Sequence, residues 1–307
     1  MEKDKKVILL AGPTSSGKSN LAIKLAKHFN GEIINADSMQ VYKEISILTS
    51  RPSSKETKKI KHHLYGFISV KRKFSTGNWL KIVKKKIEKI RKNGNVPIIV
   101  GGTGLYFKAL TDGLVDIPNI PTSFRTRIRR LHKKIGQKKF FSQLVKIDSL
   151  SKKFVLPGDS QRSMRAFEVK KYTKKSLFDF TKKTKSDFDQ SIFQKLFIDT
   201  PRDLLHKKIE KKVEKMFMEG AVDEVKKFFK LNPHKELSSN KIIGIREIRD
   251  YLKGKITLIR AKELTIQKTR QYAKRQFTWS RGHMKSWEMI YSSNIDDLFK
   301  KAVNKIS

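Results

Sequence analysis

Eight consecutive residues near the N-terminus constrain the fold of this chain more than any other feature. They are Gly12, Pro13, Thr14, Ser15, Ser16, Gly17, Lys18 and Ser19, and they match the pattern GxxxxGK[ST]. An apolar run, Val7 to Gly12, leads into them, and a helical pattern, Ser19 to Phe29, follows. In that context backbone N–H groups, a helix N-terminus and a lysine all point at one anion. The segment predicts a diphosphate-binding loop (P-loop) in which Ser19 can hold Mg²⁺.

The chain then continues the alternation of strands and helices that such a loop requires. Four more apolar, β-branched runs predict buried strands: Glu32 to Ala36, Val96 to Gly101, Lys195 to Asp199 and Trp287 to Ser292. Helical patterns cover Leu80 to Arg91, Leu204 to Phe229 and Lys262 to Arg281. The predicted fold class is α/β, a P-loop NTPase-like parallel sheet flanked by helices.

The middle of the chain has a different pattern. Amphipathic helices rich in Lys and Arg are predicted over Ser123 to Ile147 and Ser160 to Tyr172, with no convincing strand between Leu114 and Gln194. We therefore expect an inserted all-helical domain at 116–194 within an α/β catalytic core formed by 1–115 and 195–307.

The charge and composition of the chain indicate what kind of partner it binds and exclude some kinds of site. The chain has 70 Lys plus Arg against 29 Asp plus Glu, a net charge of +41, which favours a polyanion such as nucleic acid. An AT-rich genome, which encodes much lysine, is the alternative source of this excess. With no cysteine, disulfides, thiolate nucleophiles and cysteine zinc sites are excluded. No apolar run is long enough to cross a membrane, so we expect a cytoplasmic protein. We also expect it to act as a monomer.

A P-loop alone does not identify the phosphate compound that it holds or the reaction that follows. The third predicted strand ends at Gly101-Gly102-Thr103 without the carboxylate that hydrolytic P-loop enzymes usually carry there. Asp37, after the second strand, is the acidic residue best placed over the carboxyl edge of the sheet. Its residue type fits a helix N-cap as well as a catalyst, and these two alternatives stay open.

Several separated segments, in order and spacing, resemble the tRNA dimethylallyltransferase (isopentenyl-diphosphate:tRNA transferase) family of bacterial type along nearly the whole chain. They are the P-loop; Asp37-Ser38-Met39-Gln40-Val41-Tyr42; His62-His63-Leu64; Val100-Gly101-Gly102-Thr103-Gly104-Leu105-Tyr106; the segment from Asp159 to Glu168; and the segment from Thr269 to Trp279. Gly77-Asn78-Trp79 and Gly244-Ile245 depart from the family pattern.

This resemblance implies a reaction and a donor. A dimethylallyl group would pass from dimethylallyl diphosphate to N6 of adenosine 37, beside the anticodon, in tRNAs reading codons that begin with U. The products would be N6-(dimethylallyl)adenosine and diphosphate. The P-loop would hold the donor's diphosphate with Mg²⁺, so ATP is not the expected substrate. Asp37 would receive the amine proton, and Thr103 would lie near the reacting carbon and the bridging oxygen.

The resemblance also implies contacts with the tRNA anticodon stem-loop. Besides Asp37 and Thr103, it assigns them to Ser38, Met39, Gln40, Arg125, Gln161, Arg162, Ser163, Met164, Arg165, Arg270, Lys274 and Arg281. The helical domain would clasp the RNA, and the adenosine would be flipped out to reach the site. The alternatives are a surface helix in which Glu168 pairs with Arg162 and Arg165, and a solvated basic face along the last long helix.

Two other functions remain open from the residues themselves. A P-loop small-molecule or nucleotide kinase would bind ATP and carry arginines on a helical lid. A non-enzymatic RNA-binding protein would use the basic surface alone.

Overall fold

The computed structural model describes residues 6–182 and 184–306, which form two compact units. One comprises the chain up to Thr111 together with the chain from Phe188 onward, and the other runs from Asp112 to Asp187. The two junctions lie a few residues before those expected from the sequence, 115/116 and 194/195. Each unit is described separately below.

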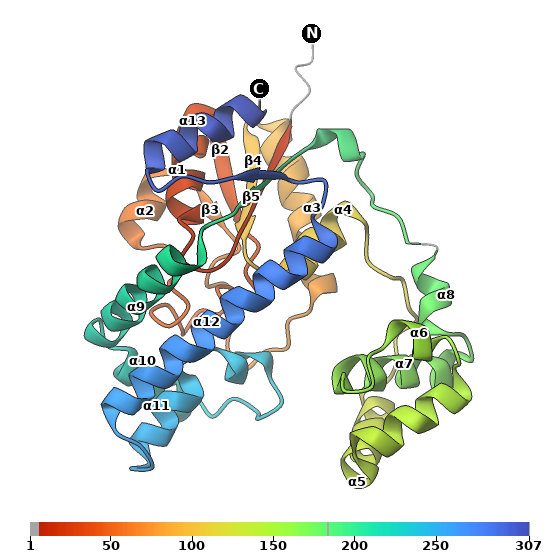
Figure 1. The fold of residues 1–307 in the computed structure, drawn as a ribbon. Helices are drawn as coiled ribbons and strands as arrows, with labels where there is room; N and C mark the ends of the chain where they lie inside the picture. Colours follow the sequence, from red (N-terminus) through yellow and green to blue (C-terminus); the bar gives the residue numbers. More distant parts are fainter. Residues whose placement is uncertain (1–5, 183, 307) are drawn as a thin grey trace. The chain divides into compact units, whose positions relative to one another are not determined.

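The first unit is built on a six-stranded sheet in which every pairing is parallel, which confirms the predicted fold class (Figure 1). The strands are β1 (Val7–Ala11), β2 (Gly31–Asn35), β3 (His62–His63), β4 (Val96–Gly101), β5 (Phe193–Ile198) and β6 (Glu288–Ile290), in the order β3-β2-β4-β1-β5-β6. Five of them match the predicted runs. Strand β3 was not predicted, because two histidines are too short and too polar to form an apolar run.

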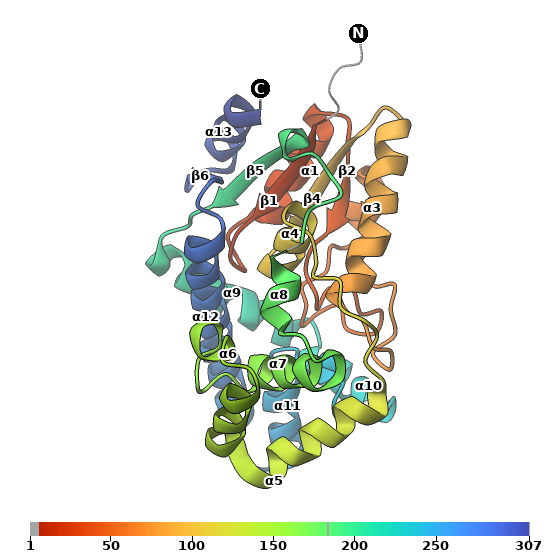
Figure 2. The same ribbon diagram turned by 90° about the vertical axis from the view of Figure 1, so that its right-hand side faces the viewer.

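Alternate side chains of the strands enter two different cores. Ile8 and Leu10 pack with α1 (Lys18–His28) and α13 (Ile295–Ile306) on one face of the sheet. Val7 and Leu9 pack with α3 (Thr76–Lys92) and α4 (Gly104–Thr111) on the other. Helices cover both faces of the sheet. The strand sequences are therefore continuous apolar runs, without alternation of apolar and polar residues. Figure 2 shows α3 and α4 beside the sheet.

Four helices of this unit form a third core with the loop that follows β2: α9 (Arg202–Met218), α10 (Ala221–Lys230), α11 (Ile245–Leu252) and α12 (Leu258–His283). The unit also contains the short helix α2 (Ser54–Lys59) and the 3₁₀ turns η1 (Gln190–Ile192) and η2 (Ser238–Lys241). The prediction of one helix over Leu204 to Phe229 is wrong, because Gly220, with φ +99°, ends α9 and starts α10. A left-handed backbone at that residue breaks the helical hydrogen-bond ladder.

The second unit is entirely helical within its described residues. It contains α5 (Thr122–Ile147), α6 (Ser151–Phe154), α7 (Ser160–Thr173) and α8 (Leu177–Thr181). Phe140 and Leu144 of α5 pack on Ala166 and Phe167 of α7 to form its small core. Gly136, at φ +75°, kinks α5 within its length. Across the described parts of both units, no helix has the length and apolarity to span a bilayer.

Candidate active site

Three neighbouring strands bring the predicted site residues to one edge of the sheet. Strand β1 lies between β4 and β5, and β2 pairs with the other side of β4. The P-loop follows β1, Asp37 follows β2 and Thr103 follows β4. Parallel strands end at the same edge, so residues that are far apart in the sequence meet there.

The P-loop encloses the N-terminus of α1. Ser15 and Gly17 have positive φ values of +65° and +91°, which turn the backbone around a central space. The Lys18 ammonium lies over that space and donates hydrogen bonds to the Pro13 carbonyl and, at 3.5 Å, to Ser16 Oγ. Burial, and next the nearby Lys212 ammonium, lower the pKa of Lys18 to about 7. Because the free site disfavours the charged form of Lys18, a bound anion, which favours that form, fits the site well.

A second lysine, which sequence reasoning did not single out, enters the same cavity. Lys212 projects from α9, and its Nζ donates to Thr14 Oγ1 at 3.2 Å. Burial lowers its pKa, and Asp37 partly offsets that effect. It was overlooked because it belongs to a lysine-rich stretch of α9 that resembles a solvated face. The sequence signal that could have identified Lys212 is its position beside Ile209 and Val213, which form the buried face of α9.

Asp37 is held by its neighbours in a fixed turn. Its N–H donates to Asn35 Oδ1 at 2.8 Å, and its own Oδ1 accepts from the Met39 N–H at 2.8 Å. No helix follows within 37–53, so Asp37 is not a helix N-cap. Its carboxylate lines the P-loop cavity with Lys18 and Lys212. This leaves Oδ2, the oxygen that the turn does not use, to accept a hydrogen bond or a proton from a ligand.

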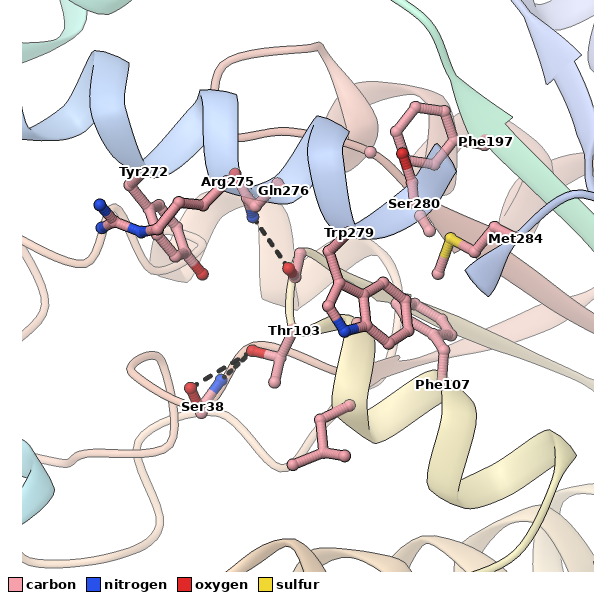
Figure 3. Close-up of a pocket in the computed structure, with 15 residues that line it drawn as sticks. Ser38, Thr103, Phe107, Phe197, Tyr272, Arg275, Gln276, Trp279, Ser280 and Met284 are labelled. Atoms are coloured by element: carbon pink, nitrogen blue, oxygen red, sulfur yellow. Dashed lines mark hydrogen bonds between the residues drawn. The ribbon is translucent and has the colours of Figure 1, made fainter. Parts of the chain in front are cut away.

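Thr103 lies beside Ser38 at the mouth of a second cavity (Figure 3). Thr103 Oγ1 accepts from the Ser38 N–H at 2.9 Å and lies 3.3 Å from Ser38 Oγ. The cavity has a volume of about 280 Å³. Its apolar lining comes from Leu105, Phe107, Phe197, Trp279 and Met284. The cavity can therefore accept an apolar or planar group next to two hydroxyls.

Gln276 of α12 lies between the two cavities and lines both, together with Gly102. Its Oε1 accepts from the Thr14 N–H at 2.9 Å, and its Nε2 donates to the Gly102 carbonyl at 2.9 Å (Figure 3). A side chain at Gly102 would overlap Gln276, and one at Gly104 would overlap the Trp279 ring. The two glycines after β4 thus allow α12 to pack closely against this edge of the sheet. The sequence showed Gln276 only as part of a longer motif.

Gln40, Met39 and Ser38, which were also predicted to contact tRNA, lie near the same edge of the sheet. The Gln40 amide NH₂ donates to the carbonyls of Thr49 and Ser50, which leaves its oxygen toward the P-loop cavity. Met39 packs against the third core. Ser38 lines the apolar cavity.

The three predicted cations of α12 lie along one hollow. Arg270, Lys274 and Arg281 line a depression of about 660 Å³ that also includes Arg202 and His206 of α9. Arg270 is ion-paired with Glu210. These three cations therefore form a basic stripe along α12, although Arg270 already has a protein partner.

Within the helical unit the predicted RNA-contact residues are divided between surface and interior. Gln161 and Arg162 are exposed, and Arg162 pairs with Asp159 at 3.5 Å. Ser163 is buried and accepts from Gln137 at 3.0 Å, and Met164 packs on the core. Glu168 pairs with Arg165 and Arg125. The predicted alternative is therefore present for Arg165, whereas Arg162 has a different partner.

Asp37 supplies the one carboxylate among the described residues that line the P-loop cavity. Among the described residues there is no cluster of three or more His, Asp or Glu side chains that could form a metal cage. Ser19 is exposed at the start of α1 and lines the cavity, as does Asp37. This donor set fits Mg²⁺, which keeps waters and takes most of its protein-site oxygens from phosphates.

Comparison with known proteins shows which family shares these features. The IPP transferase family model matches residues 40–283. A tRNA dimethylallyltransferase of Pelagibacter ubique is 54% identical over 301 residues, covering 98% of this chain and 96% of that protein. One from Rickettsia conorii is 42% identical over 306 residues, covering 98% of this chain and 84% of its own length.

Solved structures agree. A eukaryotic dimethylallyltransferase acting on tRNA superimposes with a TM-score of 0.83 at 27% identity, over 98% of this chain and 77% of that chain. A tRNA isopentenylpyrophosphate transferase of Staphylococcus epidermidis gives a TM-score of 0.69 at 31% identity, over 98% of both chains.

Proposed function

This chain belongs to the IPP transferase family, and from that premise we propose that it transfers a dimethylallyl group from dimethylallyl diphosphate to N6 of adenosine 37 in tRNA. The observation that carries this proposal is the pair of adjoining cavities on either side of Gly102 and Gln276. One is polar and holds the P-loop, two lysines and Asp37, and the other is apolar. A diphosphate joined to a short hydrocarbon needs this combination.

The donor binds with its two ends in different surroundings. Lys18, Lys212 and the P-loop N–H groups hold the diphosphate, and the five-carbon chain extends past Gly102 into the apolar cavity. As the C1–O bond breaks, negative charge grows on the bridging oxygen, and the two ammonium groups stabilise it. Mg²⁺, held by phosphate oxygens and Ser19, would neutralise further charge on the leaving diphosphate.

The acceptor amine approaches from beside Asp37. The lone pair of N6 is delocalised into the purine, so a carboxylate that accepts a hydrogen bond from the amine orients it and then takes its proton. The new bond forms between N6 and C1, the C1–O bond breaks, and the proton passes to Asp37 Oδ2. The Ser38 N–H holds Thr103 Oγ1 in place, and we propose that this hydroxyl group lies near the reacting centre.

The RNA supplies the polyanion that the net charge of +41 favours. The exposed arginines of the helical unit and the stripe on α12 contact the phosphates of the anticodon stem-loop, and the adenosine leaves the base stack to reach Asp37. We also propose that the enzyme, whose substrate is tRNA, acts in the cytoplasm and as a monomer.

The decisive experiment is mass spectrometry of nucleosides from tRNA incubated with the protein, dimethylallyl diphosphate and Mg²⁺. N6-(dimethylallyl)adenosine is expected, restricted to tRNAs that read codons beginning with U. Phosphoryl transfer from ATP without any prenylated nucleoside would support a kinase instead, an alternative that the relatives do not favour. RNA binding with neither reaction would leave only a binding protein.

Donor binding should take up a proton above neutral pH. The pKa of Lys18 is about 7 in the free site, so at pH 8 this lysine is mostly neutral. The diphosphate raises that pKa, and affinity is therefore full below pH 7 and falls by up to about tenfold per pH unit above it. Calorimetry at pH 8 in buffers of different ionisation enthalpy should report uptake of close to one proton. Equal heats in all buffers, or the same uptake in Lys18→Met, would contradict this assignment.

A further inference from the structure

One buried carboxylate lies between the two main helices of the helical unit. Glu168 of α7 is 5% exposed, next to the core residue Phe167. Its Oε2 lies 3.6 Å from Arg165 Nη1 on the same helix and 3.9 Å from Arg125 Nε on α5. A single oxygen thus connects a guanidinium from each helix.

Three guanidinium groups act on the Glu168 carboxylate. Burial raises its pKa, and the positive charges of Arg125, Arg165 and Arg129, the last one turn after Arg125 on α5, oppose that rise. Burial, and next the positive charge of the nearby Arg125, lower the pKa of Arg165. Without Glu168 between them, these two cations would repel and separate. A buried carboxylate paired with partly exposed guanidinium groups adds little to the stability of a small core, which leaves room for a role beyond folding.

Each guanidinium keeps part of its surface free. Arg125 turns Nε inward, where that atom is buried and finds no hydrogen-bond acceptor among the described residues. Its side chain is nevertheless 38% exposed, so the exposed part is the outer end. Arg165 faces Glu168 through Nη1 and is 36% exposed. A guanidinium has five N–H donors in a rigid fork, and both residues therefore retain donors for an outside acceptor.

We propose that Glu168 is a positioning residue that holds Arg125 and Arg165 as a preformed pair of guanidinium groups for a phosphodiester of the tRNA. This inference depends on the proposed function, in which the helical unit contacts the anticodon stem-loop. Two converging forks match the oxygens of one phosphate. Because Glu168 fixes them before the RNA arrives, binding loses less side-chain entropy.

The test is Glu168→Gln, which preserves shape and removes charge. Simple electrostatics predicts tighter RNA binding, because the protein loses a negative charge. Positioning predicts the opposite, roughly tenfold weaker binding of an anticodon stem-loop RNA, since residues in one ion-pair network are strongly coupled. The KM for dimethylallyl diphosphate and the rate at saturating RNA should not change. Binding is measured by fluorescence anisotropy at a temperature where circular dichroism shows a folded protein.

A matched control and a double variant separate positioning from folding. Glu263→Gln removes the same charge from another Glu–Arg pair at i,i+3 spacing, that of Arg260 and Glu263 on the exposed face of α12. It should not weaken binding. In an Arg125→Ala/Arg165→Ala background, adding Glu168→Gln should weaken binding no further, because its effect passes through those arginines. A purely structural role would lower affinity in both backgrounds.

The outcomes also separate this inference from the proposed function. If the arginine variants weaken RNA binding but Glu168→Gln does not, the positioning role is wrong and the RNA contact stands. If the Arg125→Ala/Arg165→Ala variant does not affect binding, the contact of these two arginines with tRNA is wrong, and the positioning role fails with it. If Glu168→Gln is unfolded at every temperature, Glu168 is a structural residue and the proposal is overturned.

Discussion

Asp37→Asn is expected to slow prenyl transfer roughly a thousandfold in single turnovers, within the range for loss of a general base. Asparagine can still accept the Met39 N–H hydrogen bond that shapes the turn, so the surrounding loop should persist. It cannot take the amine proton. The affinity for tRNA should change little, since one neutralised carboxylate does not weaken contacts with phosphates. Rapid-quench assays with saturating donor and tRNA would measure the rate.

The control for Asp37 is another aspartate at the same edge of the sheet. Asp199 follows β5 and is exposed; it lines the hollow along α12 but neither the P-loop cavity nor the apolar cavity. Asp199→Asn removes an equal charge and should leave the rate at saturating substrates unchanged. Full single-turnover activity in Asp37→Asn would show that the proton goes elsewhere.

Lys212→Met is expected to lower kcat/KM for dimethylallyl diphosphate by about a hundredfold, comparable to the loss of one donor to a developing anion. The reason is its position. Its Nζ lies 3.2 Å from Thr14 Oγ1 in the cavity that encloses the P-loop, where little water screens its charge. Lys18→Met should have an effect of at least the same size. Steady-state kinetics with the donor varied at saturating tRNA would measure both.

The neighbouring Lys211 is the matched control. It follows Glu210 on the same helix and is exposed outside the P-loop cavity. Lys211→Met removes the same charge one residue away and should leave the KM for the donor unchanged. Equal effects of Lys211→Met and Lys212→Met would mean that only the net charge of α9 matters, and Lys212 would then have no direct contact with the diphosphate.

Local patterns in the sequence were sufficient for five of the six strands of the α/β unit. The runs that became β1, β2 and β4 are buried on both faces, so they could be recognised without their neighbours. The P-loop could be recognised because its glycines, lysine and serine all act within eight consecutive residues. Helix α9 was extended too far in the prediction because Gly220 acts through a backbone angle that an apolar pattern does not report.

Local sequence patterns could not assign the residues whose role depends on partners far away in the sequence. Lys212 and Lys211 are the same residue type, adjacent in one lysine-rich stretch, yet only Lys212 points into the P-loop cavity. Gln276 connects Thr14 to Gly102 across 262 and 174 positions of the chain. Glu168 could be paired by spacing with Arg162 or Arg165, and packing of α5 against α7 added Arg125 instead of Arg162.

The sequence by itself determined five of the six strands, the phosphate-binding loop and the family, because these depend on short patterns and on resemblance to related chains. Tertiary structure alone decided which of many similar lysines and arginines face a ligand and which carboxylates hold them. The physical reason is that a charge acts through distance and burial, and both are set by how separate helices pack and not by the order of residues within one of them.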